Sequence, residues 1–408
     1  MKINKPELLS PAGDMEKLIY AIEYGADAVY LAGQMYGMRA ASANFSLEEL
    51  KDAITYAHER GVKVYVTCNT LTKEQGLPEL PEYLRYLESI CVDGVIVADL
   101  GVLRLIKRHA PSLNIHISTQ TSIVNHEAAA MYHELGAKRV VVARELSLEE
   151  IKRIRDNAPP DLEIETFVHG AMCVSYSGRC LLSNYMTGRD ASAGACAASC
   201  RWSYNLVEEK RPGEYMPVVE DERGTYILNS RDMCMIEHIP ELIRCGIDSF
   251  KIEGRVKTFY YAAVITGAYR RAIDTYLENP EGWVCPPELR EEVCKVSHRE
   301  YFTGFYFGMK PGSEYYPDSK YIRDWNVSAV VEFCDGVNTL VTQRNRFQTG
   351  DEAELLMPGG VVIPFTIGEM KNREGEIITA APHPNMSVSL ALPVCAPKYS
   401  IIRKNISV

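Results

Sequence analysis

The first 260 residues repeat one pattern of hydrophobic and polar positions. A short apolar run rich in β-branched residues is followed by a turn and then by an amphipathic stretch. Such alternation is typical of parallel strands covered by helices. Eight strands are predicted, at residues 7–12, 27–33, 62–69, 93–99, 114–119, 139–145, 163–170 and 248–254. The pattern therefore predicts an α/β fold with a TIM-like (β/α)8 barrel, and the periodicity leaves a doubly wound open sheet as the alternative.

Two of the predicted helices carry their own start and stop signals. Ser46 precedes an amphipathic stretch with Glu49 three positions later, and Gly61 follows its end. The segment 147–159 begins in the same way and stops at a pair of prolines. A serine followed three residues later by glutamate is the pattern of a capping box.

The connection between the seventh and eighth predicted strands, residues 171–247, is an insertion. It is far longer than the usual loops of about two to six residues on either side of one helix. It contains four closely spaced cysteines, a predicted β-hairpin at 203–230 and a predicted helix in 231–246 that brings a fifth thiol, Cys234. Long insertions on the catalytic face of a barrel usually carry function.

A different pattern begins near residue 326. Residues 258–300 continue as helices, in which Tyr269 and Ile273 are expected to lie in the core. Short alternating runs joined by Gly-rich and Asn-rich turns then predict a small antiparallel β-barrel. We therefore expect a barrel domain at 1–310 with its Cys-rich insert, a linker at 311–325 and a small β-barrel domain at 326–408. Its basic segments "QRNRF" and "IIRKN" are either phosphate contacts or ordinary solvated surface.

Composition and charge restrict the partners. The formal net charge of −10 argues against a surface that is basic throughout but permits a local patch that binds nucleic acid. The chain contains no apolar run of the roughly 18 to 20 residues that cross a bilayer. Its first residues lack a secretory pattern, so we expect a cytoplasmic protein without a membrane partner. Reducing conditions there do not sustain structural disulfides, which favours metal or redox chemistry for clustered cysteines.

The cysteines fall into two groups. Cys173, Cys180, Cys196 and Cys200 lie among Gly, Ser, Ala and Asn, where thiolates suit tetrahedral zinc or an iron–sulfur cluster. Their spacing differs from the paired C-x2-C motif of zinc ribbons. Nearby glycines would also let backbone amides approach the sulfurs of a cluster, so an iron–sulfur cluster is favoured over zinc. The others are expected to be inert small hydrophobic residues: Cys68, Cys91, Cys245, Cys285, Cys294, Cys334 and Cys395. A nucleophilic Cys173 activated by His169 is a further possibility.

The C-terminal ends of the predicted strands are polar, whereas the residues just before them are Val, Ile, Leu and Ala. In a parallel barrel these ends converge on one mouth, where catalytic and binding residues lie. The polar ends include Asn69, Gln120, Arg144, His169, Glu253 and Arg255.

Several segments together resemble the signature of peptidase family U32, the collagenase-like proteases. They are "ETFVHGAMCVSYSGRCLLSNY" (165–185), "GACAASCRWSY" (194–204), "NSRD" (229–232) and "KIEGRVK" (251–257), and the opening of the chain is similar as well. Some members of that family are described as proteases and others as oxygen-independent hydroxylases that hold a 4Fe-4S cluster. Within the family, the chain most resembles members that use prephenate to hydroxylate the wobble uridine of tRNA.

The resemblance implies roles for particular residues. The cluster ligands fall on Cys173, Cys180 and one or both of Cys196 and Cys200, with Cys234 as the fifth candidate. We take His169 and Glu253 as catalytic candidates. The substrate-binding candidates are Arg39, Asn69, Gln120, Arg144 and Arg255.

Arginine forks suit the two carboxylates of prephenate or an RNA phosphate, although Arg144 and Arg255 could instead pair with Glu145 and Glu253. The implied partners are tRNA, the small-molecule carboxylate co-substrate and a shorter paralogue of the same family.

Two other function classes stay open. A U32-type peptidase is the alternative, but the chain has no G-x-S-x-G elbow and no H-E-x-x-H motif. A non-catalytic RNA-binding protein whose cysteines bind structural zinc is the second alternative. A tRNA uridine hydroxylase with a 4Fe-4S cluster explains the thiols, the glycines and the polar strand ends together.

Overall fold

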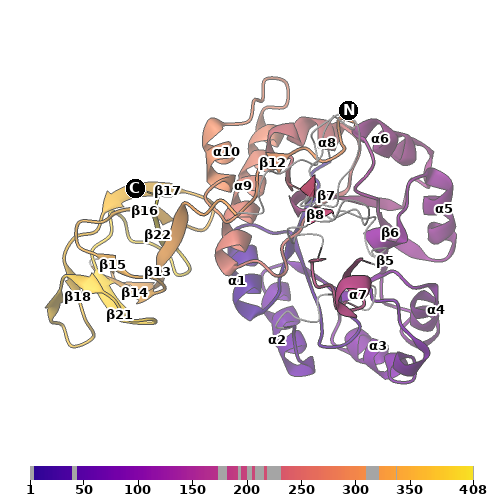
Figure 1. The fold of residues 1–408 in the computed structure, drawn as a ribbon, viewed down its shortest axis with the longest axis horizontal. Coiled ribbons are helices and arrows are strands. Elements are labelled where there is room, and N and C mark those ends of the chain that lie inside the picture. Colours follow the sequence, from indigo (N-terminus) through magenta and orange to yellow (C-terminus); the bar gives the residue numbers. More distant parts are fainter. Residues whose placement is uncertain are drawn as a thin grey trace.

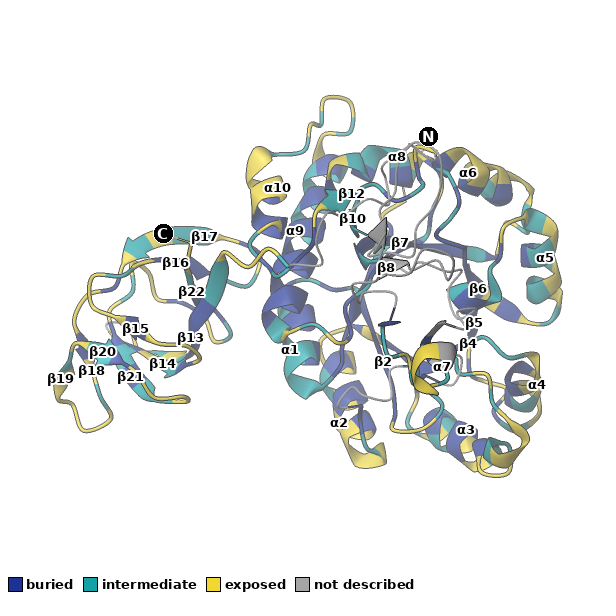
Figure 2. Cartoon of the chain, in the orientation of Figure 1, coloured by how far each residue is buried: buried dark blue, intermediate teal, exposed yellow. Residues whose placement is uncertain are grey.

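The structure is a computed structural model that describes residues 4–38, 44–172, 182–191, 194–199, 205–206, 216–217, 231–308, 321–336 and 338–407. These residues form a closed parallel β-barrel surrounded by helices, followed by an all-β region at the C-terminal end of the chain (Figure 1). The barrel strands are dark blue in Figure 2, whereas the outer faces of the helices are exposed.

Eight parallel strands make the barrel. They are β1 (Glu7–Pro11), β2 (Ala28–Leu31), β3 (Lys63–Cys68), β4 (Gly94–Val97), β5 (Ile115–Ile117), β6 (Ala137–Val141), β7 (Glu163–Ala171) and β11 (Ser249–Ile252). Consecutive strands pair with one another, β1 pairs with β11, and β11 also pairs with β7. This last pairing closes the sheet. The predicted (β/α)8 barrel is therefore confirmed, and the open doubly wound sheet is wrong.

The helices pack around the outside of the barrel. They are α1 (Met15–Glu23), α2 (Leu47–His58), α3 (Leu80–Ser89), α4 (Leu100–His109), α5 (His126–Glu134), α6 (Leu148–Asn157), α9 (Phe259–Glu278) and α10 (Pro287–Val293). Ser46 and Ser147 form the predicted capping boxes at the starts of α2 and α6. Tyr269 and Ile273 on α9 are fully buried, as expected. Apolar stripes on these helices cover the outward face of the barrel.

The lower, N-terminal half of the barrel interior holds an ion network. The Arg139 guanidinium lies 2.6 Å from the Glu7 carboxylate, 2.7 Å from Glu163 and 3.0 Å from Glu165. Glu165 also pairs with Lys251 at 2.7 Å. The apolar residues noted in the sequence lie just before the C-terminal strand ends. In this lower half the interior is instead filled by charged side chains that satisfy one another's charges.

Part of the insertion lies on the barrel wall. The strand β10 (Asp232–Cys234) pairs antiparallel with β7, which places Cys234 opposite His169, and β12 (Tyr301–Phe302) pairs with β10. The 3-10 helix η4 (Ile236–His238) and α8 (Ile239–Arg244) follow β10, and α7 spans Leu182–Thr187. Within the predicted hairpin, β8 (Asn205–Leu206) and β9 (Met216–Pro217) pair antiparallel, while the rest of that hairpin lies outside the described residues.

The C-terminal β region is an antiparallel sheet in the order β17-β16-β22-β13-β14-β21-β18-β19. Its strands are β13 (Trp325–Cys334), β14 (Thr339–Gln343), β16 (Glu352–Leu356), β17 (Val362–Thr366), β18 (Met370–Lys371), β19 (Ile377–Ile378), β21 (Ser387–Leu390) and β22 (Ile401–Asn405). A separate ladder joins β15 (Phe347–Gln348) to β20 (Ala380–Ala381). The sheet forms a half-barrel around its own apolar core, which includes Phe347, Leu355 and Ile402.

This β region packs against the barrel beside α1, α9 and α10 (Figure 1). The Tyr24 hydroxyl donates to the backbone oxygens of Leu356 and Tyr399 at 3.1 and 3.2 Å. The buried Arg403 guanidinium donates to the carboxylates of Glu292 on α10 and Glu354 on β16, each at 2.7 Å. These contacts join the two parts through buried polar groups as well as apolar surface.

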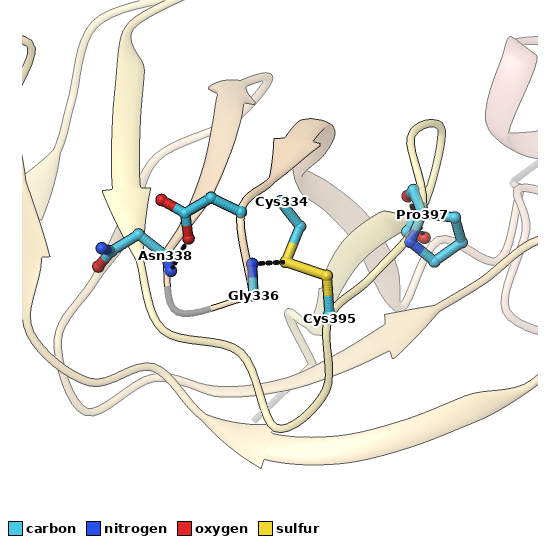
Figure 3. The surroundings of a disulfide bond; sticks show 7 residues. Cys334, Gly336, Asn338, Cys395 and Pro397 are labelled. Atoms are coloured by element: carbon cyan, nitrogen blue, oxygen red, sulfur yellow. Dashed lines mark hydrogen bonds between the residues drawn. A yellow bond between two sulfur atoms is a disulfide. The ribbon is translucent and has the colours of Figure 1, made fainter.

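A disulfide links Cys334 at the end of β13 to Cys395 (Figure 3). The Gly336 N–H donates to the Cys334 sulfur at 3.4 Å. The interpretation of these two cysteines as inert hydrophobic residues is therefore wrong. Their Cα atoms lie 5.8 Å apart, within the range of disulfides, although 61 positions separate them along the chain.

Among the described residues, no helix has the combined length and apolar character required to cross a membrane.

Candidate active site at the mouth of the barrel

The C-terminal ends of the barrel strands form a mouth that contains most of the described candidate residues. Arg39, Cys173, Cys180 and Cys200 were also predicted to belong to the site, but they lie outside the described residues. The other candidates fall on four parts of the fold: the strand ends, the segment after β11, the strand β10 and the short segment 194–199 of the insertion.

Glu253 directly follows β11 and is held by hydrogen bonds from several sides. Its N–H donates to the His169 backbone oxygen at 2.8 Å, and Tyr261 donates to its backbone oxygen at 2.8 Å. The Tyr30 hydroxyl, from inside the barrel, lies 3.2 Å from its carboxylate. Gly170 lies so close that an added Cβ would be 2.3 Å from the Glu253 backbone oxygen, and its φ is +109°. Glycine is therefore required where β7 meets Glu253.

Arg255 is buried at the same mouth. Its guanidinium donates to the Thr67 hydroxyl on β3 at 3.0 Å, and 4% of the residue is exposed. The turn after β1 supports its backbone, since a Cβ on Gly13 would lie 2.1 Å from the Arg255 oxygen. The "SPAGD" segment thus fixes the position of an arginine that follows β11. Thr67 was missed by sequence reasoning because threonine is also an ordinary strand residue.

Arg144, Gln120 and Asn69 lie at neighbouring strand ends. The Arg144 guanidinium donates to the Ala171 backbone oxygen at 3.1 Å and lies 5.1 Å from the centre of the Phe167 ring. The Gln120 side-chain oxygen accepts from Ser118 at 3.1 Å. Asn69 accepts from the Met38 N–H at 3.1 Å and so anchors the loop that precedes Arg39.

His169 is enclosed by aromatic side chains. Its ring lies 5.5 Å from Tyr269, 6.0 Å from Tyr261 and 5.1 Å from Tyr301, measured between ring centres, and its Nδ1 is 3.3 Å from the Tyr269 hydroxyl. Burial, and to a smaller extent the positive charges of His298 and Lys257, keep the pKa of His169 well below its usual range. The imidazole is therefore neutral, and it packs between β7 and helix α9 behind the strand ends.

Cys234 is half-buried on β10, opposite His169. Burial raises the pKa of its thiol to about 12, although hydrogen bonds from the Ile236 backbone and the Tyr269 hydroxyl act in the opposite direction. Tyr269 thus contacts both His169 and Cys234, a link that sequence reasoning missed because it assigned Tyr269 to the core. The Cys196 thiol is exposed and accepts from the Ala198 N–H at 3.3 Å.

Within the described part of the chain, no group of three or more His, Cys, Asp or Glu side chains is arranged to hold a metal ion. Of the five candidate ligands, Cys196 and Cys234 are among the described residues, and the other three lie outside them. The two described thiols are both free cysteines. Free thiols on the mouth side of a barrel are chemically suited to iron or zinc.

The fold and the mouth define a (β/α)8-barrel protein with a charged, hydrogen-bonded mouth and an inserted thiol-bearing strand. The chain matches the description "Peptidase family U32" over residues 13–315 and "Peptidase family U32 C-terminal domain" over residues 323–403. It belongs to peptidase family U32.

Three relatives illustrate the likeness. The chain is 40% identical to tRNA hydroxylation protein P1 of Bacillus subtilis, over 95% of this chain and 92% of the relative. It is 37% identical to tRNA hydroxylation protein P of Escherichia coli, over 99% of this chain and 97% of the relative. It is also 46% identical to an uncharacterized protease of Methanocaldococcus jannaschii, over 74% of this chain and 73% of the relative.

Proposed function

We propose that this protein is an enzyme that hydroxylates tRNA. The observation that carries the proposal is its identity of 37–40% with two proteins named for tRNA hydroxylation, each aligned over more than nine-tenths of both chains. Both parts of the fold, the barrel and the C-terminal β region, fall within these alignments. The mouth described above is the site that we assign to the reaction.

In its finer form, the proposed reaction is prephenate-dependent, oxygen-independent 5-hydroxylation of the wobble uridine. Conversion of a C5–H bond into C5–OH is a two-electron oxidation. Without O₂, water would supply the oxygen atom, and a co-substrate must accept the two electrons and two protons that are released. We assign this acceptor role to prephenate. A 4Fe-4S cluster would be held by four of Cys173, Cys180, Cys196, Cys200 and Cys234. The half-buried Cys234 and the exposed Cys196 fit this donor set because both are free. When bound, the cluster supplies electron-transfer chemistry that amino-acid side chains lack.

The other residues of the mouth bind and orient the substrates in this proposal. Arg255 and Arg144 are buried and fixed by oxygens on β3 and β7, so their guanidiniums are positioned to bind the carboxylates of prephenate. Arg39 belongs to the same proposed set, and Asn69 orients the loop before it. The Glu253 carboxylate, next to the Tyr30 hydroxyl, is the group that we propose to hold or move a proton.

Two further aspects belong to the proposal. A cytoplasmic location follows from the tRNA substrate. A shorter paralogue of the same family is a candidate partner. The peptidase alternative rests on the name of the family and of some relatives, and no described feature of the mouth favours it.

The test combines metal analysis with analysis of the product. Anaerobically purified wild type and the five Cys→Ser variants are assayed for iron, acid-labile sulfide, zinc and visible absorption. We expect about four irons and four sulfides per chain, lost in the ligand variants. Nucleoside mass spectrometry of tRNA from a deletion strain is expected to show loss of 5-hydroxyuridine derivatives, restored by the wild-type gene. A folded protein without iron, or a deletion strain with unchanged tRNA, would contradict the proposal.

A further inference from the structure

A groove of about 770 Å³ lies between the rim of the barrel and the C-terminal β region. It is lined by Ala171 and Glu253 at the ends of β7 and β11, and by Trp325 and Arg344 from the β region. The volume lies within the range of about 300–1,000 Å³ that is typical of ligand sites. A molecule bound at the mouth could therefore continue directly into this groove.

The groove combines cationic and aromatic side chains. The Lys257 amine lies 4.5 Å and the Arg323 guanidinium 5.7 Å from the centre of the Tyr321 ring. The Arg344 guanidinium lies 5.4 Å from the Phe259 ring. Among the described lining residues, three cations face one carboxylate, Glu253, although the whole chain has a net charge of −10. The lining is thus cationic, although two carboxylates outside it, Asp232 and Glu16, pair with Lys257 and Arg344.

Two of the three cations, Arg323 and Arg344, are accessible, whereas the Lys257 side chain is 16% exposed and lies 3.9 Å from the Asp232 carboxylate. Arg323 is exposed and donates to the Ser297 hydroxyl at 3.1 Å, which fixes its direction. Arg344 pairs with Glu16 at 2.6 Å, and the two side chains are 33% and 43% exposed. Ion pairs at such exposed positions are weak, so an anion can replace this carboxylate.

Two neutral features of the groove also suit a nucleotide. The Asn326 side-chain oxygen is buried and accepts no hydrogen bond within the part of the chain that the structure describes. It lines the groove, where it could accept from the amino group of a base. Thr258, the N-cap of the 20-residue helix α9, also lines the groove, so the positive end of that helix adds to the field of the three cations.

We propose that this groove binds unpaired nucleotides of the RNA that lie next to the target base in the mouth. Aromatic rings stack on unpaired bases of any sequence, and nearby arginine and lysine contact the backbone phosphates. The groove favours a single strand because stacking requires bases that are not already paired. This inference rests on the proposed tRNA hydroxylation and assigns the C-terminal β region a part in holding the substrate.

The binding test uses the full-length, anaerobically purified protein and a labelled, unmodified anticodon stem-loop RNA with uridine at the wobble position. Fluorescence anisotropy over a range of KCl concentrations gives the affinity and its salt slope. For the double variant Arg323→Gln/Arg344→Gln, we expect at least about a tenfold loss of affinity and a slope smaller by roughly 1.4, or about 0.7 per lost phosphate contact. Arg373→Gln, a surface change outside the groove, is the matched control and should bind as the wild type does.

A second measurement does not need the arginine variants. Trp325 lines the groove and is one of three tryptophans, so stacking or close approach of a base should quench its fluorescence. We expect Trp325→Phe to lose most of the RNA-induced quenching, whereas Trp283→Phe, away from the groove, should keep it. Quenching that is unchanged in Trp325→Phe would count against RNA in the groove.

The outcomes separate this inference from the proposed function. If the wild type hydroxylates RNA but the double variant binds with the same affinity and slope, the groove proposal is wrong and the proposed function stands. If the wild type neither binds nor hydroxylates RNA, both are wrong. Retained RNA affinity, together with loss of a copurifying polypeptide from the double variant, would assign the groove to a protein partner and overturn the proposal.

Discussion

The two ends of the barrel both contain buried arginines, but the groups around them differ. At the lower end, Arg139 contacts the carboxylates of Glu7, Glu163 and Glu165. At the mouth, Arg255 donates to a hydroxyl and Arg144 to a backbone oxygen. Carboxylates neutralise a guanidinium, whereas hydrogen bonds to neutral oxygens fix its direction without cancelling its charge. The lower network therefore supports the fold, whereas in the proposed function the contacts of Arg255 and Arg144 orient their guanidiniums towards an anion.

The titration of the lower end agrees with a structural role. Burial alone would raise the pKa of Glu7, but the charge and hydrogen bonds of Arg139, with the Tyr65 hydroxyl, lower it overall. His116, which lies against the Tyr65 ring, has a pKa well below its usual value because of burial and the charges of Arg139 and Lys251. At neutral pH the lower end therefore combines the ionised Glu7 carboxylate with the neutral His116 imidazole.

The largest expected effect on stability comes from breaking the lower network. Glu165 is fully buried and is shared by Arg139 and Lys251, so Glu165→Ala would leave two buried cations undercompensated. We expect the free energy of unfolding to fall by about 3–5 kcal/mol, measured by urea denaturation. Glu163→Ala is the matched control, because its side chain is 32% exposed and Arg139 keeps two other carboxylates. If both variants lose the same small amount of unfolding free energy, the lower network does not stabilise the fold as this comparison of the two ends requires.

The second prediction concerns the mouth. Arg255→Gln removes the charge while keeping a planar group that can reach Thr67. If Arg255 binds a carboxylate of prephenate, kcat/KM for prephenate should fall by roughly 10- to 150-fold, the equivalent of about 1.5–3 kcal/mol. Steady-state kinetics of hydroxylation, with prephenate varied, measure this. The free energy of unfolding should change much less than in Glu165→Ala. Unchanged kinetics combined with a large loss of stability would make Arg255 a structural residue like Arg139.

The sequence predicted the barrel well because its signals are local. Apolar runs marked all eight barrel strands, and serine–glutamate pairs marked the starts of α2 and α6. Strand ends therefore identified Glu253 and Arg255 as residues of the mouth before any geometry was known. In a parallel barrel, position along a strand is enough to predict which end of the barrel a residue occupies.

Features that depend on distant partners could not be predicted in this way. The three-residue strand β10 has no periodicity of its own and forms because it pairs with β7. The Cys334–Cys395 disulfide joins segments 61 positions apart that gave no local signal. The direction of the His169 side chain was also hidden, since a register shift between Lys251 and Ile252 disturbs the alternation of the neighbouring strand.

The lower network was missed for a different reason, because its signal was present in the sequence. Arg139, Glu165 and Lys251 are charged residues inside predicted strands, where a packed interior would need apolar ones. Oppositely charged residues at the same level of neighbouring strands indicate an ion network inside a barrel. Comparing the interiors of the predicted strands, as well as their ends, could have revealed this network.

The third prediction uses the pH dependence of the lower end. The pKa of His116 is lowered in the folded protein, so below about pH 6.5 the unfolded chain binds a proton that the folded protein does not. The free energy of unfolding is therefore highest above this pH and decreases as the pH falls below 6.5. Between pH 7.5 and 5.5 the wild type should lose about 1.4 kcal/mol that His116→Gln does not lose. Urea denaturation at both pH values measures the difference, with the exposed His383→Gln as control. If all three proteins lose the same free energy of unfolding between the two pH values, protonation of His116 does not destabilise the fold and the prediction is wrong.

The smallest expected effect tests how the mouth holds its arginine. Thr67→Val removes the hydroxyl that accepts from Arg255 at 3.0 Å and keeps the shape of the side chain, while Thr67→Ser keeps the hydroxyl. Because this bond orients Arg255 without neutralising it, Thr67→Val should lower kcat/KM for prephenate by only a few fold, or about 1 kcal/mol. Thr67→Ser should stay near the wild type, and the double variant Thr67→Val/Arg255→Gln should be no worse than Arg255→Gln alone. If the two substitutions lower kcat/KM additively in the double variant, Thr67 contacts the substrate itself. The anion would then be bound by the Thr67 hydroxyl as well as by the Arg255 guanidinium.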